Sequence, residues 1–282
     1  MKRFLNIILL LALLVAGCAP ASTPTPTAVP ATEAPTSAPT AVPTSTPEPR
    51  TLIVFAASSL TDAFAEIGED FEAANPGVTV TLNFAGSQAL RTQIEEGAPA
   101  DVFASANKTQ MDAVIAASLI TEGTQQNFLK NKLVVVLPAN NPAGLEKLED
   151  LANPGIKLVL AAEEVPVGNF ARQALDLMNG SFGADFKDRV LANVVSNEDN
   201  VRQVLTKVEL GEADAGIVYT SDAIASPDLQ TIEIPSELNV IATYPIAPLV
   251  ESANFDLAEA FIAYVLSADG QAVLQKWGFG SP

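Results

Sequence analysis

From Thr51 to the end of the chain, short apolar runs alternate with longer amphipathic stretches, and this alternation restricts the fold more than any other feature. Buried strands are expected at 51–56, 78–84, 101–104, 132–137, 157–161, 190–195, 215–219, 231–234 and 240–250. Helices are expected at 60–74, 88–96, 110–117, near 145, and at 170–178, 201–210, 257–266 and 270–277. This order predicts an α/β fold with mainly parallel sheets that are covered by helices on both faces.

Residues 1–17 have the three parts of an export signal. Lys2 and Arg3 give a positive start, residues 7–15 are apolar, and small residues precede Cys18. The apolar run is shorter than the roughly 20 residues that a membrane-spanning helix needs, so a signal peptide is predicted. The ending Leu-Val-Ala-Gly-Cys is similar to the bacterial lipobox, in which the chain is cut before the cysteine and the cysteine is acylated. The alternative is an ordinary signal peptide followed by an accidental cysteine.

Residues 18–50 are almost entirely Pro, Thr, Ala and Ser. This composition favours polyproline II and cannot form a core, so a linker that reaches up to roughly 100 Å from the membrane is predicted. An adhesive stalk is the alternative. Cys18 is the single cysteine of the chain. The folded part, from 51 onward, therefore has to be stable without a disulfide.

Charge and composition exclude several classes of protein. The chain has 15 basic and 33 acidic side chains, a net charge of −18, and no histidine. Nucleic-acid binding and strong attraction to anionic lipid are disfavoured, and neither a Ser-His-Asp triad nor a Cys/His zinc site can form. Ser105 and Lys108 match the Ser-x-x-Lys pattern of penicillin-recognising enzymes, but the companion Lys-Thr-Gly is absent. We therefore expect no catalytic residues and no enzyme activity.

Four turns lead from a predicted strand into a predicted helix, at 56–62, 84–88, 165–169 and 197–201. Ser59 stands at an N-cap position with Asp62 three residues later, and Ser87 follows Gly86. Ligands of open α/β sheets bind at the carboxyl ends of the strands, and helix N-termini there bind anions through free N–H groups. Each turn alone is more simply explained as a helix cap. Together the four turns favour an anion site without deciding it.

Several segments resemble the signatures of periplasmic molybdate-binding proteins, which serve molybdate ABC transporters. The segments are Phe-Ala-Ala-Ser-Ser-Leu-Thr-Asp-Ala at 55–63, Gly-Ala-Pro-Ala-Asp-Val-Phe at 97–103, Leu-Val-Val-Val at 133–136, Gly-Ile-Val-Tyr-Thr-Ser-Asp-Ala at 216–223 and Trp-Gly-Phe at 277–279. The resemblance runs in order from Thr51 to Phe279. It implies a type II periplasmic-binding-protein-like fold with two α/β lobes and a ligand cleft between them. Residues 51–132 and 250–282 would form the first lobe, and 133–249 the second lobe with the crossover strands.

The resemblance also implies which residues bind the ligand. Hydroxyl groups and backbone N–H groups would hold the oxyanion, and the residues that carry them are Ser59, Ser87, Val167, Val201 and Tyr219. Val167 stands where the family has Ala, and a backbone donor tolerates this change. Without the family, Tyr219 would be interpreted as a core or rim tyrosine. No direct protein ligand to a metal and no cofactor are expected.

The expected function is capture of molybdate, and of tungstate, outside the cytoplasmic membrane by a lipid-anchored monomer. The expected partners are an ABC permease and its ATPase. Because carboxylates would repel the ligand, Glu163, Glu164 and Asp199 are expected to point away from it or to be paired. Two alternatives remain open: the same scaffold with sulfate or phosphate as its ligand, and a structural or adhesive lipoprotein that binds no small molecule.

Overall fold

The computed structural model describes residues 48–282. The predicted signal peptide, Cys18 and most of the predicted linker lie outside the described residues. Residues 48–282 form one compact unit. Its first strand begins at Arg50, the last residue of the predicted linker, and the Arg50 guanidinium pairs with Asp256 at 2.6 Å.

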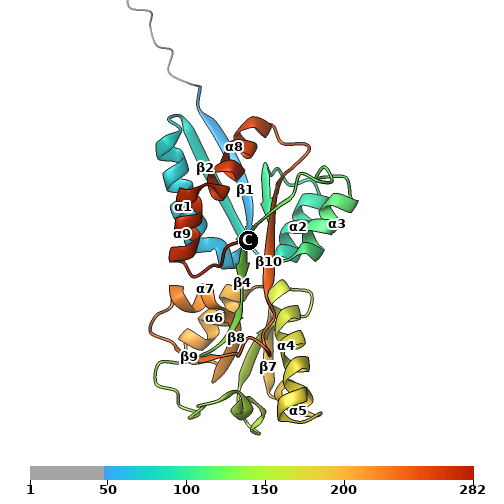
Figure 1. Cartoon of the computed structure of the whole chain (residues 1–282), viewed down its shortest axis with the longest axis vertical. Coiled ribbons are helices and arrows are strands. Elements are labelled where there is room, and N and C mark those ends of the chain that lie inside the picture. The colour runs from blue at the N-terminus through green and yellow to red at the C-terminus, as the bar shows by residue number, and fades with distance from the viewer. Residues whose placement is uncertain (1–47) are drawn as a thin grey trace, which may run out of the picture. The chain divides into compact units, whose positions relative to one another are not determined.

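Two five-stranded sheets form the centres of two lobes (Figure 1). The order in the first sheet is β2 (Val78–Ala85), β1 (Arg50–Ala57), β3 (Val102–Ala104), β10 (Ala242–Pro248) and β4 (Gln126–Asn131). The order in the second sheet is β7 (Val194–Glu198), β6 (Leu158–Ala161), β8 (Ala215–Tyr219), β5 (Leu133–Leu137) and β9 (Gln230–Glu233). The two lobes confirm the expected fold class.

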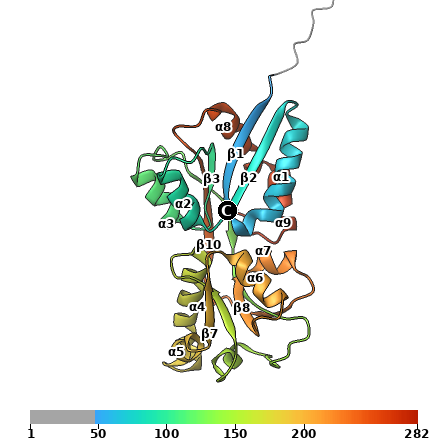
Figure 2. The ribbon, with the colours of Figure 1, turned by 180° about the vertical axis from the view of Figure 1, so that it is seen from behind.

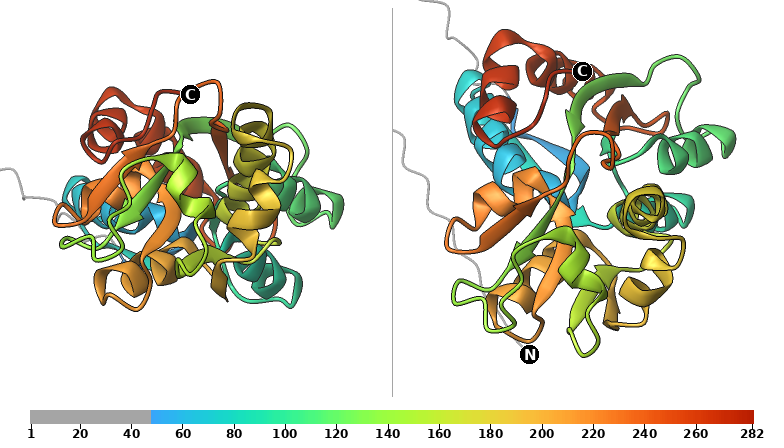
Figure 3. Two further views of the ribbon diagram at one scale, coloured as in Figure 1. Left: turned by 90° about the horizontal axis from the view of Figure 1, so that it is seen from below. Right: turned by 60° about the horizontal axis from the view of Figure 1, so that its bottom comes forward.

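Helices cover both faces of each sheet, as Figures 1 and 2 show from opposite sides. In the first lobe, one face carries α1 (Thr61–Ala74), α8 (Phe255–Leu266) and α9 (Ala268–Lys276), and the other carries α2 (Ser87–Glu95) and α3 (Lys108–Ala116). In the second lobe, α6 (Val201–Glu209) and α7 (Thr220–Ala225) face α4 (Pro166–Phe182) and α5 (Phe186–Leu191) across the sheet, as the view from below in Figure 3 shows. Two 3-10 helices, η1 (Ser58–Leu60) and η2 (Leu148–Ala152), complete the described elements.

The first strand shows why its sequence is apolar from Leu52 to Ala57. Leu52 and Val54 pack into the core under α1 and α8, whereas Phe55 packs with residues of α2 and α3 on the opposite face. Successive side chains of a strand point to opposite faces, so a strand with helices on both faces needs apolar residues at consecutive positions. The apolar run at 51–56 therefore predicts a central strand correctly.

The prediction of mainly parallel sheets was wrong, because each sheet is mixed. In the first sheet, β10 runs antiparallel to β3 and to β4. In the second, β5 runs antiparallel to β8 and to β9. The strands β5 and β10 enter their sheets from the other lobe and run away from it, whereas β1, β6 and β8 run toward the other lobe. The alternation of apolar runs and amphipathic stretches in the sequence does not reveal in which direction a strand runs within its sheet.

The chain crosses between the lobes twice. It leaves the first sheet at Asn131, the end of β4, and enters the second at Leu133. It returns between Glu233 and Ala242, because β10 pairs with β3 and β4. Residues 242–248 therefore lie in the first sheet. The sequence analysis had included them in 133–249, the expected second lobe with the crossover strands.

Five further differences concern single elements. The sequence analysis did not predict β4, α5 or α7, and the helix expected near 145 is the 3-10 helix η2. The strand expected at 190–195 begins only at Val194, since α5 extends to Leu191. Within residues 48–282, no single helix is long and apolar enough to span a membrane. The pair α8 and α9, bent by 62°, meets those criteria of length and composition only when taken together.

Candidate functional site

The four turns that were singled out in the sequence meet at one small cavity between the lobes. The cavity volume is about 10 Å³, far less than the roughly 300–1,000 Å³ of pockets for drug-sized ligands. The lining residues are Ala57, Ser58, Ser59, Ala85, Gly86, Ser87, Ala106, Val165, Pro166, Val167, Val201 and Tyr219. They include all five predicted site residues. The cavity is therefore too small for a drug-sized ligand.

Ser59 lies in η1, directly after β1, and its side chain is buried. The prediction that Ser59 caps the first helix was wrong: α1 begins at Thr61, its N-cap residue is Leu60, and no side chain caps it. The extra 3-10 turn displaces Ser59 from the cap position. Its Oγ instead forms a hydrogen bond of 2.8 Å with the Tyr244 hydroxyl.

Ser87 is the first residue of α2, after Gly86 at the N-cap. Its Oγ accepts a hydrogen bond of 3.0 Å from the Ala106 N–H. Because a backbone N–H can only donate, the Ser87 hydroxyl keeps its own proton for another acceptor. Ser87 is buried and lines the cavity, so this proton is available to a ligand there.

Val167 and Val201 stand at the starts of α4 and α6. Val167 follows Pro166, the first residue of α4, and Val201 is the first residue of α6. The first N–H groups of a helix have no acceptor within the helix and carry partial positive charge. The Asn200 side chain caps α6 by accepting from the Gln203 N–H, and this leaves the Val201 N–H uncapped. Two helix starts therefore offer backbone donors at the cavity.

Tyr219 ends β8, and its side chain is only 1% exposed. Its hydroxyl is buried and has no hydrogen-bond partner among the described residues. A buried hydroxyl without a partner is costly, at about 1–3 kcal/mol, so such groups are usually explained by a missing ligand or water. Burial raises the pKa of Tyr219 well above its usual value, so the phenol keeps its proton and can donate.

No charged side chain of the described part of the chain lines this cavity. Glu163, Glu164 and Asp199 are exposed and contribute no lining side chain, in agreement with the expectation. The backbone carbonyl of Asp199 accepts a hydrogen bond of 2.9 Å from Gln88 Nε2, which joins the start of α2 in the first lobe to the second lobe. The cavity therefore presents neutral donors in an apolar surrounding.

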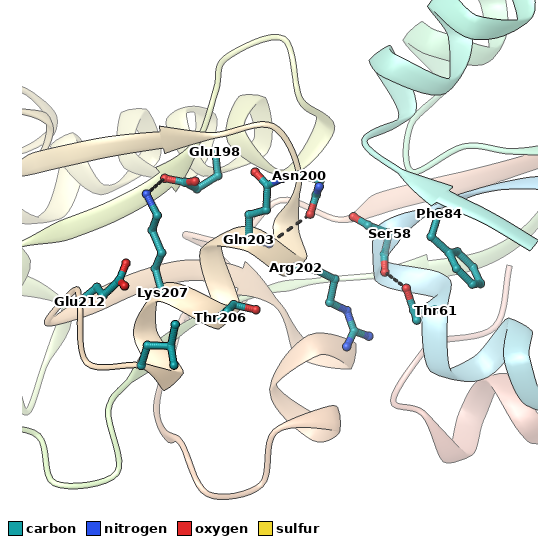
Figure 4. Close-up of a pocket in the computed structure, with 11 residues that line it drawn as sticks. Ser58, Thr61, Phe84, Glu198, Asn200, Arg202, Gln203, Thr206, Lys207 and Glu212 are labelled. Atoms are coloured by element: carbon teal, nitrogen blue, oxygen red, sulfur yellow. Dashed lines mark hydrogen bonds and ion pairs between the residues drawn. The ribbon is translucent and has the colours of Figure 1, made fainter.

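A wider groove borders the cavity at Ser58 and runs along α6, and Figure 4 shows the side chains that line it. Two of them, Glu198 and Glu212, are carboxylates, which would repel an anion. Lys207 pairs with Glu198 at 2.7 Å and offers no free positive charge. The groove is therefore a poorer anion site than the enclosed cavity, despite its larger size.

Arg202 lies beside the cavity and connects the lobes. From α6 in the second lobe it faces η1 and the start of α1 in Figure 4, and its guanidinium forms an ion pair with Asp62 of α1. Arg202 Nε also lies 3.0 Å from Asp222 Oδ1, a charge contact whose angle is not that of a hydrogen bond. Burial raises the pKa of Asp222 to about 6, although Arg202 opposes this shift.

Sequence reasoning missed Arg202, Asp222 and Tyr244. Asp62 was assigned to a capping box, whereas it pairs across the lobes. A tyrosine within the segment 242–250, which was expected to be extended, was the available signal for Tyr244, because a hydroxyl in a buried strand needs a partner. The partner, Ser59, is 185 positions away in sequence and could not be named from it.

The described residues hold no group of three or more His, Cys, Asp or Glu side chains that could bind a metal ion. The Ser-x-x-Lys match has a structural explanation: the buried Ser105 hydroxyl donates to the Asn107 carbonyl at 2.8 Å, while Lys108 is exposed. The arrangement therefore lacks an activated nucleophile at this position.

Comparison with known proteins agrees with the fold. The sequence model of the bacterial extracellular solute-binding proteins matches residues 52–280. The molybdate-binding protein ModA of Mycobacterium tuberculosis H37Rv is 41% identical over 234 residues, which cover 83% of this chain and 85% of that protein.

Solved structures show the same architecture. The substrate-binding domain of a putative molybdenum ABC transporter from Clostridium difficile is 30% identical, with a TM-score of 0.63, and the match covers 83% of this chain and 99% of that one. The periplasmic molybdate-binding protein of Azotobacter vinelandii has a TM-score of 0.72 at 19% identity, covering 82% and 99%, which supports the fold alone. The family consists of solute-binding proteins that need no cofactor, not of enzymes. The chain belongs to the bacterial extracellular solute-binding proteins and, within them, to the molybdate-binding protein family.

Proposed function

We propose that this chain captures molybdate, and also tungstate, outside the cytoplasmic membrane and delivers it to an ABC importer. The observation that carries the proposal is the small cavity that is lined by neutral donors and by no charged side chain. The proposed ligand-binding groups are two hydroxyls from the first lobe and one hydroxyl and two backbone N–H groups from the second. The residues are Ser59, Ser87, Tyr219, Val167 and Val201.

This donor set suits a dianion that carries no proton. Ser87 already accepts from the Ala106 N–H, and the Tyr219 phenol keeps its proton, so both hydroxyls donate to a ligand. The starts of α4 and α6 add partial positive charge without a Lys or Arg. A ligand that needs to donate its own proton, as protonated phosphate does, finds no carboxylate in the cavity to receive it.

The magnitude of binding is compatible with a high-affinity carrier. Hydrogen bonds to a charged group contribute about 1.5–3 kcal/mol each, so five donors give roughly 7–15 kcal/mol before costs. Loss of translational and rotational freedom and desolvation of the dianion reduce this sum. Micromolar to nanomolar dissociation constants correspond to about 8–12 kcal/mol, which lies within the range of the sum before these costs.

Location and partners follow from the family and from the N-terminal sequence. Extracytoplasmic solute-binding proteins hand their ligand to a membrane permease that is driven by an ATPase, and we propose such a complex as the partner. Cleavage before Cys18 and its acylation would anchor the protein, with residues 19–49 as the spacer. The protein would act as a monomer, because one chain supplies both lobes and all five donors.

Calorimetric titration of the purified protein with molybdate, tungstate, sulfate and phosphate tests the proposal. We expect tight 1:1 binding of molybdate and tungstate and far weaker binding of sulfate and phosphate. Tyr219→Phe and Ser87→Ala should each weaken molybdate binding by about 10- to 100-fold, since each removes one donor to a charged ligand. Tyr264→Phe, a tyrosine of α8 outside the cavity, is the matched control and should bind as the wild type does.

Other outcomes would change the proposal in defined ways. Preferential binding of sulfate or phosphate would keep a carrier function and replace its ligand. Absence of heat, together with unchanged thermal unfolding in the presence of all four oxyanions, would refute oxyanion binding, because a ligand that binds only the folded state must stabilise it. A structural or adhesive lipoprotein would then be favoured.

A further inference from the structure

Tyr244 lies beside the cavity without lining it. It belongs to β10, the strand by which the chain re-enters the first lobe, and its side chain is fully buried. Its hydroxyl lies 2.8 Å from Ser59 Oγ, and its ring packs edge-to-face on Tyr219, with 5.8 Å between the ring centroids. Tyr244 therefore contacts one proposed ligand-binding side chain from each lobe.

The direction of the Tyr244–Ser59 hydrogen bond decides what Ser59 can offer a ligand. Burial raises the pKa of Tyr244 above its usual value, so its hydroxyl keeps the proton. A phenol is a stronger hydrogen-bond donor than an aliphatic hydroxyl, which favours donation from Tyr244 to Ser59. Ser59 Oγ is then the acceptor, and its own proton is free to turn toward the cavity that the residue lines.

Ser87 has the same arrangement, and there the direction is fixed. The Ala106 N–H donates to Ser87 Oγ at 3.0 Å and cannot accept. Ser59 and Ser87 thus each have a protein donor on their oxygen, and each keeps one proton for the ligand. If Ser59 donated to Tyr244 instead, its oxygen would present lone pairs to the cavity and would repel a dianion.

We propose that Tyr244 is a positioning residue that holds Ser59 as an acceptor and thereby directs the Ser59 proton to the bound oxyanion. This inference rests on the proposed function. It adds a residue that never touches the ligand but sets the polarity of one that does. The role is distinct from that of Tyr219, whose hydroxyl is itself without a partner in the described structure.

The test is a double-mutant cycle of Tyr244→Phe and Ser59→Ala, read by calorimetric titration with molybdate. Tyr244→Phe keeps the ring and removes only the hydroxyl, and we expect molybdate binding to weaken about tenfold. In the Ser59→Ala background the same change should have no more than about a twofold effect, because the hydroxyl that it orients is gone. A residue with a merely structural role would weaken binding equally in both backgrounds.

Two further variants control the cycle. Tyr264→Phe removes the hydroxyl of a tyrosine on α8, outside the cavity, and should leave the affinity unchanged. Site-specific replacement of Tyr244 by 3-fluorotyrosine keeps the hydroxyl and makes it a stronger donor, so affinity should equal or exceed that of the wild type. This second variant tests the inference even if Tyr244→Phe does not fold.

The inference and the proposed function fail in different ways. Unchanged affinity of Tyr244→Phe, equal losses in both backgrounds, or loss of affinity with 3-fluorotyrosine would overturn the inference while wild-type binding of molybdate upholds the function. A wild-type protein that binds none of the four oxyanions would overturn both.

Discussion

Gly86 permits the two lobes to approach each other, and replacing it should weaken ligand binding without unfolding the protein. A Cβ at Gly86 would lie 2.5 Å from the Asp199 carbonyl oxygen of the other lobe and would also contact the Gln88 side chain. The Gln88 side chain can move, but the Asp199 carbonyl is backbone, so the lobes themselves would have to shift. The φ of Gly86 is −61°, which any residue adopts, so alanine brings no backbone strain.

The magnitude follows from the cost of overpacking, which is typically about 1–3 kcal/mol. Since about 1.4 kcal/mol is a factor of ten in a dissociation constant, Gly86→Ala should weaken molybdate binding by about 5- to 150-fold. Thermal unfolding of the ligand-free protein should shift only modestly, because glycine is favoured over alanine at the N-cap of α2 by roughly 0.5–1 kcal/mol.

Gly68→Ala is the matched control. Gly68 lies inside α1, and the nearest atom to its added Cβ is 3.6 Å away, an ordinary contact. This variant should raise the unfolding temperature, because alanine favours a helix over glycine by up to about 1 kcal/mol, and should bind molybdate as the wild type does. Wild-type affinity of Gly86→Ala, measured by calorimetry beside this control, would refute the idea that the ligand-bound lobes approach as closely as they do here.

Two further predictions concern the charges beside the cavity. Asp62→Asn removes the cross-lobe ion pair with Arg202. Because both groups are partly exposed, this pair contributes up to about 1 kcal/mol, so stopped-flow release of molybdate should accelerate up to about fivefold. Asp256→Asn breaks an ion pair within the first lobe and should leave the release rate unchanged. The pKa of Asp222 is raised from 3.8 to about 6, so the stability that its neutral form contributes is complete below about pH 4 and is lost as the pH rises through 6. Denaturant unfolding of the wild type, relative to Asp222→Asn, should therefore show a loss of about 1–3 kcal/mol between pH 4 and pH 7, and parallel pH profiles would contradict the burial argument.

Strands that are buried on both faces were predicted well from the sequence. Elements that depend on contacts distant in the sequence were predicted poorly. Residues 51–56 and 215–219 are apolar at consecutive positions because helices cover both faces of the strands that they form, and both strands were found. The segment 126–131 was missed because β4 lies at the edge of the first sheet and three of its six residues are exposed. The strand expected at 190–195 begins later than predicted, because its first two residues, 190 and 191, belong to the short helix α5.

The candidate site was likewise predictable from the sequence only in part. Ser59, Ser87, Val167, Val201 and Tyr219 were named from local turns and from a resemblance, and the structure brings all five to one cavity. Their roles as ligand groups stay predictions. Local turn chemistry reveals which strand ends carry donors because a helix start leaves its N–H groups free wherever it occurs.

Sequence alone determined the α/β class and the positions of the donor-bearing turns, since these depend on hydrophobic periodicity and on residues within a few positions of each other. The tertiary structure decided that β5 and β10 run antiparallel to their neighbours, that Asp62 pairs with Arg202, and that Tyr244 supports Ser59. These contacts join residues 140 and 185 positions apart. Their geometry follows from how two lobes fold back on each other, and no local pattern encodes that distance.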